Sequence, residues 1–208
     1  MYHSNLTRHL IGSGLILFML VFSGSLLAVE ASNVGQGINS PEYTRTMAHY
    51  KVPDVAIMRQ DGKLLSSLLE LDDGRPVILN FVFVSCTAIC PMLSHVLSKV
   101  QSKLNKDKQS FHLVSISIDP ENDTPTQLIE YAKKFGAGDN WDFYTGTRKN
   151  SLVLQKTFDA YRGDKMNHQS VILMRAKPGE SWIRVEGFMS PDVVFNEYNA
   201  MLQQAIIE

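Results

Sequence analysis

Two uninterrupted apolar runs, the first of them followed by a helical pattern, constrain the fold of this chain most. Residues 76–85 read PVILNFVFVS and residues 111–118 read FHLVSISI. A strand without polar alternation is buried on both faces, and such strands belong to parallel sheets covered by helices. Residues 92–104 follow the first run and carry apolar side chains at helical spacing: Leu93, Val96, Leu97, Val100 and Leu104. These runs predict helices packed on a central sheet.

The remaining segments continue the alternation of strands and helices. A helix is expected over residues 124–135, because Thr124 can cap it, Pro125 suits its first position and Gln127 completes a capping box. The other expected elements are strands at 52–58 and 141–144, a short apolar segment at 64–71, a helix at 151–161, a hairpin of 171–175 with 182–187, and a closing helix at 191–206. This order predicts an α/β sandwich with a central mixed sheet flanked by helices.

The N-terminal residues predict export. Residues 10–29 carry no charge and follow Arg8 and His9, which fits either a cleaved signal peptide or an uncleaved membrane anchor within residues 1–31. Residues 32–50 are polar, lack a period and contain glycine and proline, as in a linker. One domain is expected over residues 51–208. The periplasm is the expected location, with the domain either soluble or anchored to the inner membrane.

Net charge and cysteine content exclude several classes of protein. The 208 residues have a net charge of −1, so no basic surface for nucleic acid is expected. The two cysteines exclude a disulfide scaffold and a zinc site of four cysteines. They are either incidental or a deliberate pair, and an oxidising compartment makes their pairing chemically relevant.

The spacing and position of the cysteines indicate a functional pair. Cys86 and Cys90 lie in SCTAICP, directly after the strand expected at 76–85. Sites in α/β sheets collect at the carboxyl ends of strands. Pro91 is expected at the first helical position, so the helix dipole would stabilise a thiolate in the preceding loop. The four-residue separation admits a disulfide or a shared metal ion, and both remain open. Redox enzymes of the thioredoxin type usually have only two residues between the cysteines.

A histidine would extend the chemistry of the pair. Two thiolates suit Cu(I), and an added imidazole gives a site that also accepts Cu(II). His95 follows the pair in the expected helix, and His168 lies in a polar loop before the hairpin, so both are candidates. His112 stands at the start of a strand, which is the wrong end of the sheet.

Other side chains near the pair have simpler explanations. Met92 and Met166 could lend a thioether to Cu(I), but packing or exposure explains them more simply. Asp119, Glu121 and Asp123 are expected in a solvated loop, because the segment lacks the glycine of a calcium loop.

Four pieces of sequence, in order, carry a resemblance to a known family. They are FVFVSCTAICP, SISIDPENDTP, WDFYTG, and His168 followed by Ser170 and a strand. Over roughly residues 52–205 the chain resembles the SCO/SenC copper proteins. The resemblance implies a thioredoxin-like fold and a copper ion held by Cys86, Cys90 and His168.

The resemblance also implies a role and partners. The implied role is delivery of copper to a respiratory copper centre such as the copper-A site of cytochrome c oxidase, or reduction of the oxidised cysteines of that centre to thiols. The implied partners are an oxidase subunit of the subunit II type or a copper donor protein, with the membrane reached through the N-terminal segment. A metallochaperone is expected rather than an enzyme. The alternative is a thiol:disulfide oxidoreductase that uses Cys86 and Cys90 as a redox pair without obligatory copper.

Overall fold

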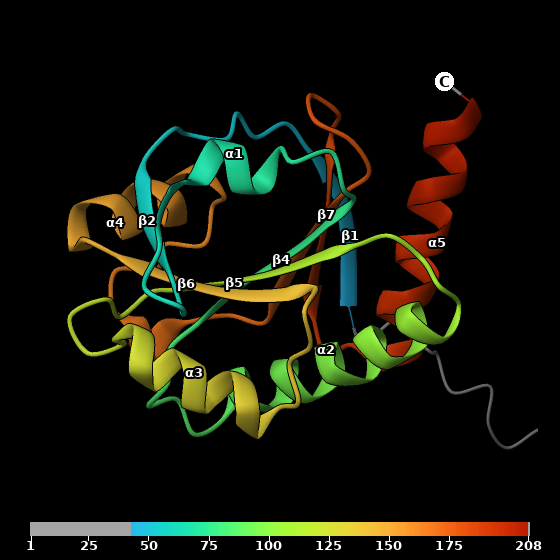
Figure 1. Ribbon diagram of the computed structural model, residues 1–208. Helices are drawn as coiled ribbons and strands as arrows, with labels where there is room; N and C mark the ends of the chain where they lie inside the picture. Colours follow the sequence, from blue (N-terminus) through green and yellow to red (C-terminus); the bar gives the residue numbers. More distant parts are fainter. Residues whose placement is uncertain (1–42, 208) are drawn as a thin grey trace, which may run out of the picture. The chain divides into compact units, whose positions relative to one another are not determined.

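One mixed sheet organises residues 43–207, the part of the chain that the computed structural model describes. The strand order across the sheet is β1-β8-β7-β4-β5-β6-β2-β3 (Figure 1). The strands are β1 (Tyr43–Ala48), β2 (Ala56–Arg59), β3 (Leu64–Ser66), β4 (Val77–Val82), β5 (His112–Ser117), β6 (Trp141–Gly146), β7 (Val171–Arg175) and β8 (Trp182–Gly187). The centre, β4-β5-β6, is parallel, and all other neighbours are antiparallel. The predicted α/β fold with a central mixed sheet is confirmed.

Helices cover both faces of the sheet, as the apolar runs require. The helices are α1 (Ser67–Leu71), α2 (Ile89–Lys106), α3 (Pro125–Lys134), α4 (Arg148–Thr157) and α5 (Pro191–Ile207), with a 3-10 turn η1 at Lys165–Asn167. The core that includes α2, α3 and α5 lies on one face, and the core that includes α1 and α4 lies on the other (Figure 1).

Strand β4 shows why its sequence lacks polar alternation. All six of its residues are buried. Ile78 packs into the core of α2, α3 and α5, whereas Val77, Leu79 and Phe81 pack into the core of α1 and α4. Since neighbouring side chains of a strand point to opposite faces, both sets must be apolar.

Several predicted boundaries are corrected by the structure. Strand β1 falls inside the predicted linker of residues 32–50 and pairs with β8 at the edge of the sheet, so the folded part begins before residue 51. Four of its six side chains are exposed, and an exposed edge strand has the polar composition of a linker. Of the strand predicted at residues 52–58, only residues 56–58 are extended in the sheet, and β2 continues to Arg59. Helix α4 starts three residues before the predicted 151, because the Thr147 side chain accepts a hydrogen bond from the Asn150 amide.

The predicted capping box of α3 is present and gives a testable contribution to stability. Thr124 Oγ1 accepts from the Gln127 amide at 3.4 Å, and the Gln127 side chain accepts from the Thr124 amide at 3.0 Å. We expect Thr124→Ala to lower the free energy of unfolding by about 1 kcal/mol. Thr126→Ala is the control, because Thr126 is exposed inside the same helix and alanine favours a helix. Denaturant unfolding of both variants measures the difference, and equal losses would contradict a capping role.

The predicted signal peptide or anchor at residues 1–31 lies outside the described residues. Within residues 43–207, no helix is both long and apolar enough to cross a membrane.

Candidate functional site

Three loops meet at one end of the sheet because of strand direction. Strand β4 runs parallel to β5 and antiparallel to β7, so the carboxyl ends of β4 and β5 lie beside the start of β7. Asn80, near the end of β4, pairs with Ile172, near the start of β7, so the loop after β4 and the loop before β7 leave the sheet at the same end. The topology therefore brings the cysteine loop after β4, the acidic loop after β5 and the loop before β7 to one place.

The cysteine loop enters its helix earlier than predicted. Helix α2 begins at Ile89 rather than at Pro91, so Cys90 is its second residue. Pro91 is tolerated at the third position, because amides in the first helical turn have no intrahelical acceptor to lose. Cys86 remains in the preceding loop, and its Sγ accepts a hydrogen bond from the Cys90 amide at 3.4 Å.

The two thiols are free and have opposite electrostatic environments. Burial acts to raise the pKa of Cys86, but hydrogen bonds from the backbone amides of Cys90, Ala88 and Ile89 outweigh it, and the pKa lies below its usual value. Cys90 is fully buried, and desolvation raises its pKa far above the usual range. Cys86 is therefore suited to attack or bind as a thiolate, whereas Cys90 stays protonated until a partner compensates its charge.

His168 supplies a buried and neutral imidazole. The residue is 6% exposed. It is the C-cap of the 3-10 turn η1, and its backbone amide donates a hydrogen bond to the Lys165 carbonyl at 3.1 Å. Burial lowers the pKa of the imidazole, and a hydrogen bond with the Phe81 backbone opposes this only in part. Nε2 is buried and has no hydrogen-bond partner within residues 43–207. Since buried polar atoms are normally paired, this nitrogen is available to a ligand.

Phe83 connects the imidazole to the thiols. Its ring lies edge-on to the His168 ring, with centroids 6.4 Å apart. Phe83 also belongs to a small apolar cluster with Val82 and Cys90, against which Cys86 packs. The three predicted ligands thus share one neighbour. Across residues 43–207, however, no three groups of His, Cys, Asp or Glu are close enough together to share a metal ion. The structure therefore places the predicted ligands at one end of the sheet without assembling them as a metal centre.

The other described histidines lie away from this end of the sheet or face solvent. His95 is exposed on α2. His49 bonds to Ser181, before the start of β8. His112 is fully buried between Asp73 and Asp142, at the start of β5, as its position in the sequence predicted.

The acidic loop after β5 is less solvated than predicted. Asp119 and Asp123 are 7% and 2% exposed, and only Glu121 is exposed as expected. Asp123 accepts hydrogen bonds from the Val84 amide at 3.2 Å and from the Ser117 hydroxyl at 2.6 Å. It therefore ties the start of the cysteine loop to the end of β5. Carboxylates that accept backbone amides in a loop carry no periodic sequence signal, so the sequence did not reveal this role.

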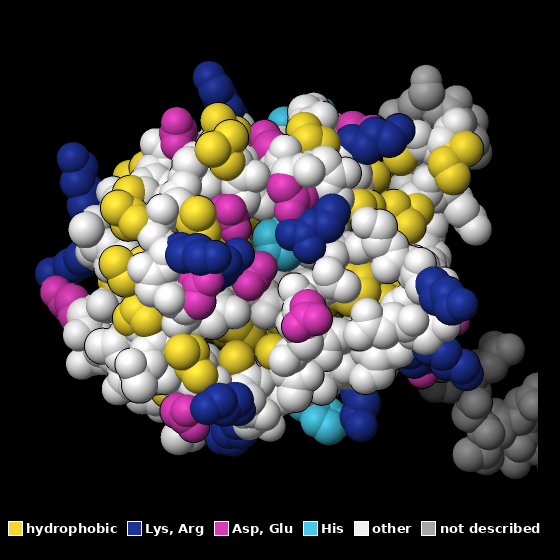
Figure 2. Space-filling view, in the orientation of Figure 1, with side chains coloured by type: hydrophobic (Ala, Val, Ile, Leu, Met, Phe, Trp, Pro, Cys, Tyr) yellow, Lys and Arg dark blue, Asp and Glu magenta, His cyan; other side chains and the backbone are white. Residues whose placement is uncertain are grey.

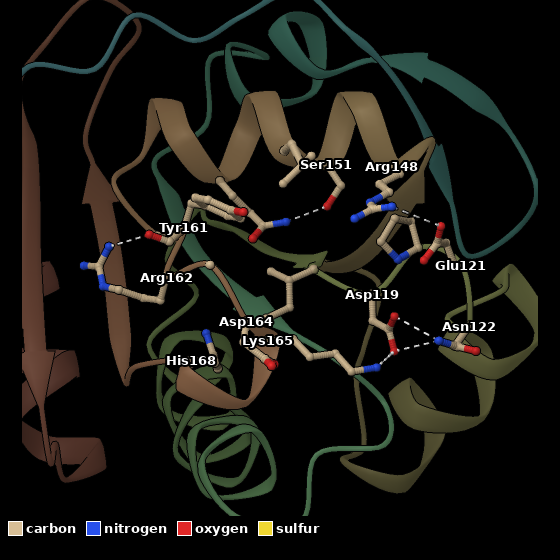
Figure 3. A pocket seen from close by; sticks show the side chains of 16 residues that line it. Asp119, Glu121, Asn122, Arg148, Ser151, Tyr161, Arg162, Asp164, Lys165 and His168 are labelled. Atoms are coloured by element: carbon tan, nitrogen blue, oxygen red, sulfur yellow. Dashed lines mark hydrogen bonds and ion pairs between the residues drawn. The ribbon is translucent and has the colours of Figure 1, made fainter.

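A polar pocket of about 370 Å³ opens beside His168. Figure 3 shows its acidic and basic side chains, with Lys165 reaching from the His168 loop to Asp119. Arg148 and Glu121 form a second pair across it, with nitrogen and oxygen 3.9 Å apart. Both signs of charge are also interspersed over the face seen in Figure 2.

The fold and the paired thiols at the end of β4 define a thioredoxin-like domain with a two-cysteine site. The SCO1/SenC family model matches residues 45–203. The SCO1 protein homolog of Bacillus subtilis (strain 168) is 34% identical over 154 residues, which cover 70% of this chain and 76% of the relative. The chain belongs to the SCO1/SenC family.

Solved structures agree with this assignment. BsSco is 28% identical to this chain, and the match has a TM-score of 0.62 over 77% of this chain and 98% of that chain. BsSco is described as a member of the Sco family of cytochrome c oxidase assembly proteins, with a disulfide switch. Arabidopsis thaliana ScoI with copper bound shares the fold at 23% identity, with a TM-score of 0.63 over 74% of this chain and 98% of that chain. The resemblance seen in the sequence is confirmed, whereas the ligand roles of Cys86, Cys90 and His168 remain predictions.

Proposed function

We propose that this protein binds one copper ion through Cys86, Cys90 and His168 and delivers it to a respiratory copper centre, such as the copper-A site of cytochrome c oxidase. Copper is the cargo in this proposal. The receiving partner would be an oxidase subunit of the subunit II type, and a copper donor protein would load the site. The uncharged residues 10–29 support a location in the periplasm, either free or attached to the inner membrane.

One observation carries the proposal: the end of the sheet that carries the cysteine pair also carries a buried imidazole nitrogen without a hydrogen-bond partner in the described part of the chain. His168 Nε2 and the two thiols share Phe83 as neighbour. Two soft sulfur donors and one imidazole fit copper in both of its common oxidation states. Copper-bound structures of relatives with this fold are consistent with the proposal.

Each side chain has a distinct part in binding. Cys86 has the lowered pKa and is the thiolate most readily formed. Cys90 gives up its proton only when the ion compensates the buried charge, so binding at this residue releases a proton. His168 is neutral because burial lowers its pKa, and a neutral imidazole is the form that binds a metal.

Reconstitution of the reduced protein tests the proposal. We expect about one copper ion per chain after removal of excess metal, measured by elemental analysis. Cys86→Ala should weaken Cu(I) binding more than about 100-fold, because a lost ligand exceeds the 10- to 100-fold cost of a lost outer partner. His168→Ala should change the Cu(II) absorption and EPR spectra.

His95→Ala is the matched control, because His95 is exposed on the helix that follows the pair. It should leave both metal stoichiometry and spectra unchanged. Failure of the wild-type protein to retain copper, or an unchanged spectrum in His168→Ala, would contradict the three-ligand proposal.

A thiol:disulfide oxidoreductase is the second candidate function. The opposite pKa shifts of Cys86 and Cys90 are typical of an attacking and a resolving thiol. In such a reaction the two thiols become one disulfide, while the partner disulfide gains two electrons and two protons. Reduction of a copper-free partner disulfide at an undiminished rate in His168→Ala would favour this function over copper delivery.

A further inference from the structure

An ion pair beside the proposed copper site joins the His168 loop to the end of β5. Lys165 Nζ lies 2.5 Å from Asp119 Oδ2, and the two side chains are 35% and 8% exposed. Figure 3 shows the Lys165 side chain extending from the His168 loop to Asp119. A carboxylate this buried needs a partner for its charge, so the pair is more than a contact between two solvated groups.

Asp119 is a fixed anchor at its end of the pair. Asn122 Nδ2 donates to both carboxylate oxygens, at 2.9 and 3.1 Å. The Asp119 amide donates to the Ser117 hydroxyl at 3.0 Å, and that hydroxyl donates to the buried Asp123. Asn122 therefore holds the carboxylate of Asp119, while Ser117 fixes the backbone of the same residue.

The other end of the pair lies three residues from the imidazole. Lys165 begins η1, and its carbonyl accepts from the His168 amide. The Lys165 ammonium also lies 5.6 Å from the centre of the Phe83 ring, and this is the ring that contacts His168. Lys165 thus contacts the same aromatic side chain that links the imidazole to the thiols.

The turn itself has little else to hold it. None of the three residues of η1 is buried, and Met166 is 73% exposed. In the 165–168 loop only His168 is buried. A segment with few buried contacts opens easily, so the ion pair of Lys165 adds a second attachment with a large influence on its position. Asp164 caps the turn only locally, by accepting from the Met166 amide.

We infer that Lys165 is a positioning residue for the proposed copper site: its ion pair with Asp119 fastens the 165–168 loop across the end of the sheet and holds the His168 imidazole beside the cysteine loop. This inference rests on the proposed function for its metal readout. The tether itself is a property of the protein without metal and is testable separately.

The test compares two variants. Lys165→Met removes the positive charge but keeps the length of the side chain, whereas Lys165→Arg retains the positive charge. Lys103→Met is the matched control, because Lys103 also joins an ion pair, with Asp192, and lies 5.2 Å from an aromatic ring centre, that of Phe195, in another part of the fold. All variants are made in the full chain and titrated with Cu(II) alone. Outer partners of metal ligands typically contribute 10- to 100-fold to affinity.

We expect Lys165→Met to weaken Cu(II) binding about tenfold and to shift the EPR spectrum toward that of His168→Ala. Lys165→Arg should have the Cu(II) affinity and the EPR spectrum of the wild-type protein, and so should Lys103→Met. In a His168→Ala background, Lys165→Met should have no further effect on Cu(II) affinity, because the two substitutions act through one ligand. An additive loss in the double variant, or a wild-type spectrum in Lys165→Met, would overturn the inference.

Hydrogen exchange of the metal-free protein separates this inference from the proposed function. Amides of residues 165–169 should exchange faster in Lys165→Met and at the wild-type rate in Lys165→Arg and Lys103→Met. If the wild-type protein binds no copper, the proposed function fails while the exchange result still tests the tether. Unchanged exchange in Lys165→Met would overturn the tether whatever the copper result.

Discussion

Iodoacetamide should label Cys86 at least about 100-fold faster than Cys90 in the reduced, folded protein at pH 7. The thiolate is the reacting species, and an ordinary cysteine is only a few per cent thiolate at this pH. Backbone amides of the α2 N-terminus lower the pKa of Cys86 despite its partial burial. Desolvation raises the pKa of Cys90 far above the usual range, and the residue is fully buried. The larger thiolate fraction and the greater solvent access therefore both favour labelling of Cys86.

The change of the two labelling rates with pH tests the direction of each pKa shift. The labelling rate of a thiol rises with pH and levels off above its pKa. The rate for Cys86 should level off at a lower pH than that for an ordinary cysteine thiol, because hydrogen bonds from backbone amides lower the pKa of Cys86. Cys90 should show no plateau in the range where the protein is folded. Mass spectrometry of timed samples from pH 5 to pH 9 measures both rates.

Single-cysteine variants and the unfolded chain are the controls. Cys90→Ala should keep rapid labelling at Cys86, and Cys86→Ala should leave a protein that is labelled only slowly. In denaturant the two cysteines should react at similar rates, because the helix terminus and the burial are both lost. Comparable rates in the folded protein would contradict the two pKa shifts, and with them the attacking role of Cys86.

The sequence was sufficient for the elements whose local chemistry is complete within the segment. The capping box at Thr124 and Gln127 predicted the start of α3. Two short segments around the turn residues 177–179 (KPG) predicted the β7–β8 hairpin at its observed bounds. Strand β1 could not be predicted this way, since its partner β8 is more than 130 residues away and its outward face is polar. Pairing at a sheet edge is a tertiary property.

The site shows the same limit more clearly. The spacing and position of Cys86 and Cys90 indicate a site, whereas His168 was one of two candidate histidines until the family resemblance selected it. Lys165 and Asp119, in contrast, are 46 residues apart and have no spacing rule that joins them. The ring of Phe83 faces His168 because β4 and β7 are antiparallel neighbours, which bring the two loops to the same end of the sheet. Side-chain chemistry in the sequence indicated the candidate copper ligands, whereas the order of the strands determines which other side chains contact those ligands.

Phe83→Ala should be among the most destabilising substitutions near the site. The side chain is 2% exposed, and it packs with Val82 and Cys90 while its ring faces His168. Truncating a buried phenylalanine lowers the free energy of unfolding by about 3 to 5 kcal/mol, because apolar contacts are lost and a cavity remains. The ring also faces the Lys165 ammonium, so the substitution removes a cation–π contact as well.

Phe188→Ala is the matched control for this change. Phe188 lines a groove that also includes His168, but its side chain is 64% exposed. Its truncation should alter the free energy of unfolding by no more than about 0.5 kcal/mol. Denaturant unfolding of the metal-free protein measures both variants.

Phe83→Leu separates the two roles of the ring. Leucine keeps most of the buried volume, so the loss of stability should be smaller than that of Phe83→Ala. It provides no aromatic face for Lys165 and no ring edge for His168, so exchange at residues 165–169 should still accelerate. If Phe83→Leu left this exchange at the wild-type rate, the ring would serve the core alone, and the ion pair of Lys165 with Asp119 would be sufficient to hold the His168 loop.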